Sequence, residues 1–168
     1  MNKNEITLAI VADFSKAFDT IKFDVIIRKL HKVGFSKQSL LWIFSYLCDR
    51  QQYIQIDDRK SSMLTVSFGV PQGSVLGPIL FNLYVSDMQD HVTAETILQY
   101  ADDTTFYHHG KILNIADCLV KTQNVLSSLQ NWSSANNLLF NEIKTKAILF
   151  SGSRLSKLNN HDDLDLQS

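Results

Sequence analysis

The stretch ETILQYADDTTFY, residues 95–107, decides how this 168-residue chain is interpreted. Two runs rich in β-branched and aromatic residues meet at Ala101-Asp102-Asp103, which is typical of a β-hairpin with its turn at the aspartates. An ordinary Asp-rich turn would explain the pair by itself, since aspartate bonds to its own backbone and tolerates left-handed geometry. The apolar flanks, Ile97-Leu98 and Phe106-Tyr107, instead favour a cation site, because they bring the acids close to a core that penalises uncompensated charge.

A third carboxylate ends another apolar run. Residues 5–13, Glu-Ile-Thr-Leu-Ala-Ile-Val-Ala-Asp, are predicted to form a buried strand with Asp13 at its end. Successive side chains of a strand point to opposite faces, so Asp102 and Asp103 can face one site only if a tight turn reorients them. A clustering of carboxylates at strand ends predicts that a cation is bound there.

The other elements follow from hydrophobic periodicity and from the breaks in it. Apolar residues at helical spacing predict helices over 23–33, 36–48, 76–88 and 113–136. Short strands are expected over 51–57 and 62–68, joined as a hairpin, and near 138–140 and 146–150, completing the sheet. Because helices and hairpins interleave without strict βαβ alternation, we expect an α+β fold, with an antiparallel or mixed sheet and helices packed on one face.

Composition limits the size and the class of the protein. A chain of 168 residues with 45% hydrophobic residues can bury one core, and its sequence turns polar after Gly152, so we expect one domain over 1–151 and a polar, disordered tail over 152–168. Lys and Arg number 16 against 17 Asp and Glu, whereas a stand-alone nucleic-acid binder normally carries a basic excess. This balance argues weakly against nucleic acid, unless part of the acidity is there to bind cations.

Two further features indicate the compartment. Cys48 and Cys118 show none of the close spacings of a zinc site or a disulfide framework, which fits a reducing, intracellular location. The apolar stretch near the N-terminus is too short for a signal peptide, and no apolar run is long enough to cross a bilayer. A soluble protein without membrane contact is therefore expected, in either the nucleus or the cytoplasm.

Three ordered motifs give the chain a specific resemblance. Asp13-Phe14-Ser15-Lys16-Ala17-Phe18-Asp19, GVPQGSVLGP from Gly69 to Pro78, and Tyr100-Ala101-Asp102-Asp103 occur in the order of motifs A, B and C of reverse transcriptases. They look most like those of non-LTR retrotransposons, the jockey-type or LINE-like elements. Trp132 followed by Asn141-Glu142-Ile143-Lys144-Thr145 is similar, more loosely, to motif D. The resemblance implies a polymerase palm with a ferredoxin- or RRM-like core.

The resemblance also implies a metal site and a reaction. By the family pattern, Asp13 and Asp102 coordinate two Mg²⁺ ions, with Mn²⁺ as an alternative, Asp103 beside them and the Phe14 carbonyl as a further ligand. Mg²⁺ prefers hard oxygen ligands, and two ions about 3.5–4 Å apart can stabilise the attacking 3′-oxygen and the leaving pyrophosphate together. The implied activity is RNA-directed DNA polymerisation, with an RNA template, a DNA primer and deoxynucleotides as partners.

Other motif residues are implied to contact the substrate. Phe18 resembles a steric gate that packs under the sugar of the incoming nucleotide and excludes a 2′-hydroxyl, although an aromatic packed behind the metal site is the ordinary alternative. Gln72 and Gly73 lie where the family contacts nucleotide and template, and Tyr100 of motif C is grouped with them. Lys144 matches a lysine near the pyrophosphate, but a solvated strand-end lysine fits the sequence equally well.

The remaining expectations concern Asp19 and the parts of a complete polymerase. Asp19 is expected to be a capping or structural acid at the start of the following helix. The resemblance covers the palm alone, and the fingers and thumb are expected to lie outside this chain. Two alternatives stay open: a remnant that acts only as a nucleic-acid or protein binding module, and an RNA-dependent RNA polymerase palm, whose pattern Phe18 and Ala101 match less well. The oligomeric state is not predicted.

Overall fold

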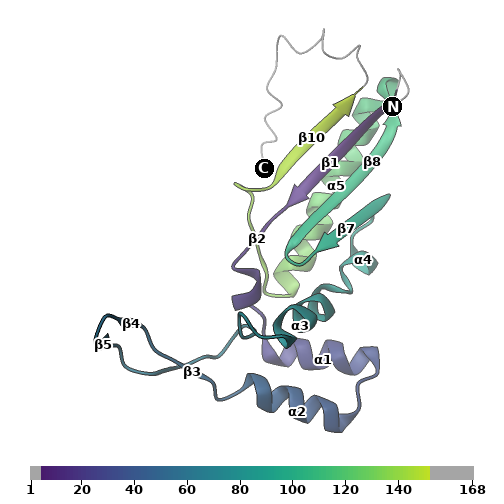
Figure 1. Ribbon diagram of the computed structural model, residues 1–168. Helices are drawn as coiled ribbons and strands as arrows, with labels where there is room; N and C mark the ends of the chain where they lie inside the picture. The colour runs from purple at the N-terminus through teal and green to yellow at the C-terminus, as the bar shows by residue number, and fades with distance from the viewer. Residues whose placement is uncertain (1–4, 152–168) are drawn as a thin grey trace.

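The structure of the protein is a computed structural model that describes residues 5–151 (Figure 1). The expected tail, 152–168, lies outside the described residues. Four strands form one antiparallel sheet: β1 Glu5–Ala12, β7 Thr96–Tyr100, β8 Asp103–Lys111 and β10 Lys146–Ser151. Their order in the sheet is β10-β1-β8-β7, and with helices after β1 and after β8 this is the βαββαβ arrangement that was expected from the resemblance.

Five helices accompany the sheet: α1 Phe23–Val33, α2 Lys37–Leu47, α3 Leu76–Val85, α4 Met88–His91 and α5 Ile115–Ala135. Two single turns of 3₁₀ helix, η1 Ala17–Asp19 and η2 Ile112–Asn114, precede α1 and α5. In Figure 1, α5 runs along one face of the sheet, and α1, α2 and α3 form a group beyond the strand ends where β1 stops. The α+β prediction with helices on one face is confirmed.

Alternation along the strands explains why the sheet has one covered and one open face. In β1, Ile6, Leu8, Ile10 and Ala12 are buried, and the register places Ile10 opposite the buried Phe106 of β8. Ile10, Ala12 and Phe106 pack with Val125 and Leu129 of α5 and with residues of α1 and α3 in one core, and Ile6 packs with Cys118 of α5 in a second, smaller cluster. On the other face, Leu98, Ile148 and Phe150 are between 42% and 56% exposed, so that face is open to solvent in the described chain.

Local signals fixed the first two helices closely. The bounds of α1 agree with the predicted 23–33, and Gly34 ends the helix with a φ of 104°, its N–H donating to His31 and Leu30 carbonyls. Ser36 caps α2 by accepting a hydrogen bond from the Ser39 N–H at 3.1 Å. Helix α1 therefore stops, and helix α2 starts, where the sequence places a capping residue.

Three elements differ from the predicted ones. The hairpin expected over 51–68 forms only two short ladders, β3 Gln51–Gln52 with β6 Leu64–Thr65 and β4 Gln55–Ile56 with β5 Arg59–Lys60, in an arm whose residues 51–65 are all exposed. An arm that packs on nothing has little to extend its pairing. The helix expected over 76–88 ends at Val85, before the short α4. The segment near 138–140 forms β9 Leu139–Phe140, which pairs with β2 Phe14–Ser15 and not with the main sheet.

A buried polar network ties α1, α3 and α5 together. Lys29 of α1 donates to the Tyr84 carbonyl and to Asp87 Oδ1, both at 2.6 Å, and its ammonium lies 4.9 Å from the Tyr84 ring centre. The fully buried Tyr84 hydroxyl donates to the Asn136 carbonyl at the end of α5, and Trp132 Nε1 donates to Asp87 Oδ1 at 3.1 Å. Burial of these groups lowers the pKa of Lys29 and raises the pKa of Tyr84 to about 12.

The raised pKa of Tyr84 predicts a loss of stability in alkaline solution. Between pH 10 and about 12 the folded protein keeps the phenol proton that the unfolded chain loses, so the free energy of unfolding should fall as pH rises, by about 3 kcal/mol at most. Lys29 acts in the opposite sense, because its lowered pKa favours folding as pH rises toward 10.5. Urea unfolding of wild type and Tyr84→Phe from about pH 9 to about pH 12 isolates the phenol, since Lys29 is common to both. A difference between the two proteins that stays constant with pH would contradict this prediction, and Tyr53→Phe, at an exposed position, serves as the control.

Candidate active site

Asp13 lies where β1 ends, surrounded by residues from the segment before β10. Its Oδ2 accepts a hydrogen bond from Asn141 Nδ2 at 3.1 Å and lies 3.7 Å from Lys144 Nζ. Its backbone is bound as well, because Asn141 N–H donates to the Asp13 carbonyl and the Asp13 N–H reaches Thr145 Oγ1. The Asp13 side chain is 26% exposed, so it remains accessible while Lys144, at 69%, extends into solvent. The structure thus brings the predicted Asp13 and Lys144 together.

The β7–β8 turn carries the other two aspartates. Tyr100 pairs with Asp103, so the turn consists of Ala101 and Asp102, and Ala101 has a φ of 54°. Two-residue hairpin turns that match strand twist need such a positive φ, which costs a non-glycine residue of order 1–2 kcal/mol. Strain of this kind is concentrated at functional sites. Asp102 is half-buried and Asp103 is exposed.

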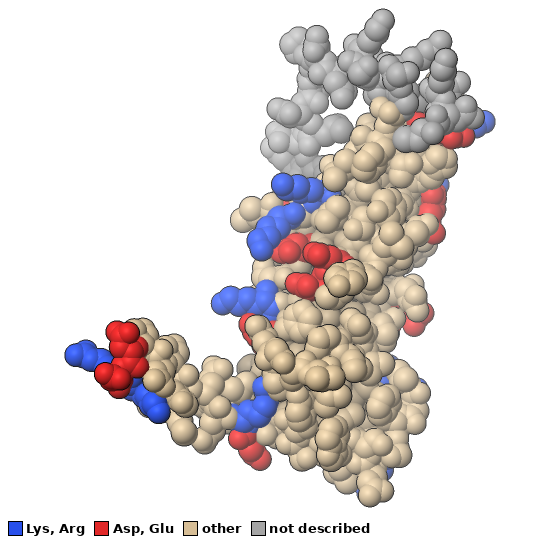
Figure 2. Space-filling view, in the orientation of Figure 1, with Lys and Arg blue, Asp and Glu red and all other residues tan. Residues whose placement is uncertain are grey.

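The sheet register brings Asp13 close to the aspartates of the β7–β8 turn, at one end of the two central strands. The β1–β8 ladder pairs Val11 with Thr105 and Ala12 with Thr104, and the next pair in this register is Asp13 with Asp103. By the alternation of side chains, both residues belong to the open face of the sheet. Figure 2 shows acidic side chains gathered on this side of the molecule, near the middle of the view, with basic side chains at their border.

The donors at this end of the sheet suit Mg²⁺ chemically. Carboxylate oxygens from two neighbouring chain segments are the hard ligands that Mg²⁺ takes. Within residues 5–151, however, no group of three or more His, Cys, Asp or Glu side chains is gathered closely enough to hold a metal ion. The backbone therefore places Asp13, Asp102 and Asp103 at the same end of the sheet, while their side chains do not form a common cluster.

The Phe14 carbonyl, predicted as a further oxygen ligand, belongs to the short β2–β9 ladder that follows Asp13. Asn141 N–H donates to the Asp13 carbonyl, and in an antiparallel ladder hydrogen-bonded pairs alternate with pairs that are not hydrogen-bonded. The next pair, Phe14 with Phe140, is therefore not hydrogen-bonded, and the Phe14 carbonyl points away from β9. The Phe14 ring is buried, with its centre 6.3 Å from the ring centres of both Trp132 and Phe140. Packing of this ring fixes the backbone that follows Asp13.

The predicted substrate-contacting residues lie on two segments. Phe18 is half-buried in the turn after Asp13, and its ring stacks on Phe81 of α3 with 4.4 Å between ring centres. Gln72 and Gly73 are exposed in the loop before α3, where Gly73 has a φ of 77° and a Cβ built on it meets nothing within 4 Å. Tyr100 is 84% exposed at the end of β7, next to the aspartate turn.

Of the two roles predicted for Asp19, capping or structural, the capping role is wrong. The N-cap position of α1 is Lys22, without a side-chain cap, and Asp19 lies in η1 with an exposed carboxylate. Asp19 Oδ1 instead accepts a hydrogen bond from Gln72 Nε2 at 2.8 Å. The carboxylate that was predicted at the start of a helix is thus bound by Gln72, 53 positions further along the chain.

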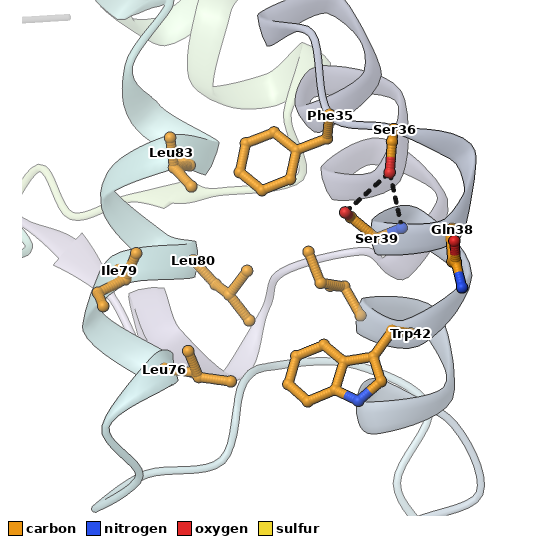
Figure 3. A pocket seen from close by; sticks show the side chains of 10 residues that line it. Phe35, Ser36, Gln38, Ser39, Trp42, Leu76, Ile79, Leu80 and Leu83 are labelled. Carbon is orange, nitrogen blue, oxygen red and sulfur yellow. Dashed lines mark hydrogen bonds between the residues drawn. The ribbon is translucent and has the colours of Figure 1, made fainter.

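A large apolar groove lies away from the aspartates. Between α2 and α3, a cavity of about 520 Å³ is lined by apolar side chains such as Trp42, Ile43, Leu76 and Leu83, with Ser36 and Ser39 at its edge (Figure 3). It has no charged lining residue and does not include any of the aspartates or motif residues predicted to bind substrate. Because of this lining, the groove is not a candidate for the reaction site despite its size.

An antiparallel βαββαβ sheet with carboxylates at the ends of adjacent strands is the architecture expected of a polymerase palm. The chain belongs to the reverse transcriptase (RNA-dependent DNA polymerase) family, whose model matches residues 1–162. It is 32% identical over 158 residues to the RNA-directed DNA polymerase from mobile element jockey of Drosophila melanogaster, covering 90% of this chain and 17% of that protein. A probable RNA-directed DNA polymerase from transposon BS of the same organism is 30% identical over 145 residues, covering 82% of this chain and 16% of that protein.

The fold comparison agrees with the sequence comparison. Telomerase from Candida tropicalis superposes with a TM-score of 0.67 at 17% identity, over 88% of this chain and 27% of that chain. The resemblance to non-LTR retrotransposon enzymes is thereby confirmed, and neither an RNA-dependent RNA polymerase nor a mere binding module is favoured. The chain spans about a sixth of the length of these curated relatives. In the part that the structure describes, even the 21-residue α5 is not apolar enough to span a membrane.

Proposed function

We propose that this chain carries the nucleotidyl-transfer site of an RNA-directed DNA polymerase, in a palm formed by residues 1–151. The substrates are deoxynucleoside triphosphates, a DNA primer and an RNA template. The observation that supports this most strongly is the register that makes Asp13 and Asp103 the next pair beyond the β1–β8 ladder, on the open face of the sheet and beside the strained turn that holds Asp102. Phosphoryl transfer needs positioned charge more than covalent chemistry, and these backbone-fixed carboxylates supply it.

Each site residue has a part in this proposal. Asp13 and Asp102 would hold two Mg²⁺ or Mn²⁺ ions, with Asp103 and the Phe14 carbonyl as further oxygen donors. When bound, such ions supply Lewis-acid stabilisation of the attacking and leaving oxygens. Lys144, whose ammonium lies 3.7 Å from Asp13, would donate a proton from Nζ to the leaving pyrophosphate.

The nucleotide is proposed to lie between the turn that follows Asp13 and the loop that precedes α3. Phe18, held against Phe81, gives the sugar a rigid aromatic surface. Gln72 offers hydrogen bonds, and the open space at Gly73 allows the backbone to approach the substrate closely. The exposed Tyr100 ring is available for stacking beside the aspartate turn.

Primer extension tests the proposal directly. The chain, given an RNA template, an annealed DNA primer, deoxynucleotides and Mg²⁺, should add nucleotides to the primer, and addition of EDTA should stop the reaction. A parallel reaction with an unrelated reverse transcriptase establishes that the substrates are competent. If that reaction proceeds and the chain adds nothing, the proposed function is wrong for this chain.

Replacement of Phe18 with valine should relax the choice of sugar. Removing the ring opens space where a 2′-hydroxyl would clash, so the preference for deoxynucleotide over ribonucleotide should fall by about tenfold to a hundredfold. The measurement is the ratio of kcat/KM for dCTP and CTP on the same template. Phe23→Val, at an aromatic residue of the neighbouring α1, is the control for general loss of packing. An unchanged ratio in an active Phe18→Val protein would show that Phe18 only packs behind the site.

A further inference from the structure

The turn after Asp13 and the loop before α3 are joined along their backbones. We call residues 16–21 the A turn and residues 69–73 the B loop. Val70 N–H donates to the Phe18 carbonyl at 2.9 Å, and Gly69 N–H donates to the Ile21 carbonyl at 2.8 Å. A Cβ on Gly69 would come within 2.8 Å of Asp19 Cα, so the two segments are in direct contact.

The A turn is held from two further sides. Asn137 Nδ2, just past α5, donates to the Thr20 carbonyl at 2.9 Å, and the Phe18 ring stacks on Phe81. The B loop is held by Arg50, whose guanidinium donates to the Gly69 carbonyl at 2.6 Å. Both backbones are therefore fixed by the fold, so the Cα positions of the exposed residues Asp19 and Gln72 are fixed as well.

A side-chain hydrogen bond also joins the A turn to the B loop on their exposed side. Gln72 Nε2 donates to Asp19 Oδ1 at 2.8 Å. A carboxylate offers only acceptors, so the amide nitrogen of Gln72 must face Asp19, which fixes the direction of the amide oxygen as well. Without Asp19, the exposed Gln72 side chain could rotate among its staggered conformers.

We propose that Asp19 is a positioning residue that orients the Gln72 amide for the incoming nucleotide. The inference rests on the proposed function, in which Gln72 contacts that nucleotide and the adjacent Phe18 contacts its sugar. Asp19 follows Phe18 directly in the A turn, so its bond to Gln72 fixes the amide relative to the sugar-binding ring. Because Asp19 and Gln72 are both exposed, their bond contributes little to folding, and its loss affects nucleotide binding instead.

The test is a double-mutant cycle on nucleotide affinity. The Kd for dNTP with Mg²⁺ is measured by titration for wild type, Asp19→Leu, Gln72→Leu and the double variant. Each single change should weaken binding by about tenfold, and the double variant should bind no more weakly than Gln72→Leu alone. Asp19→Asn keeps an acceptor oxygen for the Gln72 amide and should stay within about twofold of wild type.

The control and the contrary outcomes separate this inference from the function on which it rests. Asp24→Leu removes an exposed carboxylate from α1, away from the bond between Asp19 and Gln72, and should leave the affinity unchanged. Wild-type affinity in Asp19→Leu, a loss in Asp19→Asn equal to that in Asp19→Leu, or a double variant weakened by about a hundredfold would each overturn the positioning role. If wild type itself binds no nucleotide, the proposed function fails and this inference fails with it. Thermal unfolding of all variants checks that the fold is intact.

Discussion

Replacement of Asp102 with asparagine should reduce single-nucleotide incorporation by about 10³-fold or more while leaving the fold intact. Asparagine has nearly the same shape as aspartate but lacks the charge that a divalent cation requires. The half-buried Asp102 occupies a two-residue turn whose strained backbone is set by the β7–β8 pairing, so the substitution does not disturb packing. Rapid-quench measurement of the first nucleotide added to a primer gives the rate.

Companion variants distinguish loss of a metal ligand from a general loss of negative charge. Asp13→Asn should be as damaging as Asp102→Asn, whereas Asp103→Asn should have a smaller effect, since Asp103 is the exposed neighbour of the proposed ligands. Asp90→Asn, at an exposed position of α4, should have none. Incorporation by Asp102→Asn at more than about a tenth of the wild-type rate would show that these carboxylates do not hold catalytic ions.

Elements whose ends are marked locally could be predicted closely from sequence. Helix α1 combines an apolar stripe with Gly34 in the left-handed region, and both signals lie within the helix and its next residue. β9 shows the opposite case. Leu139–Phe140 has strand-forming residues, but its partner was decided by Phe14–Ser15, more than a hundred residues earlier in the chain. Local propensity indicates that a strand forms and does not choose between two available edges.

The same distinction separates the parts of the site. Asp13, Asp102 and Asp103 could be proposed because their motifs are short and local. The contacts of Asp13 with Asn141 and Thr145 were not predicted, although both residues stand in the quoted motif D run, because the pairing spans 128 and 132 positions. The charge balance argued weakly against nucleic acid, yet the chain belongs to a family of RNA-dependent DNA polymerases, so a net charge near zero did not indicate this family.

Replacement of Gly69 with alanine should destabilise the protein far more than the same change at Gly34. Both glycines have positive φ, 82° and 104°, so alanine costs each about 1–2 kcal/mol of backbone strain. At Gly34 the new methyl group meets nothing within 4 Å. At Gly69 it would lie 2.8 Å from Asp19 Cα and 2.9 Å from the Phe18 carbonyl oxygen, which are backbone atoms and not a movable side chain.

The backbone at Gly69 cannot move away cheaply, because its own N–H and that of Val70 are bonded to the A turn. We therefore expect Gly69→Ala to lower the free energy of unfolding by about 3–5 kcal/mol, against about 1–2 kcal/mol for Gly34→Ala, as measured by urea denaturation. Gly69→Ala should also abolish nucleotide binding at temperatures where the variant is still folded, because the methyl group separates the A turn from the B loop. Equal losses of stability in the two variants would mean that the close approach of these segments contributes nothing, and that Gly69, like Gly34, is required only for its φ.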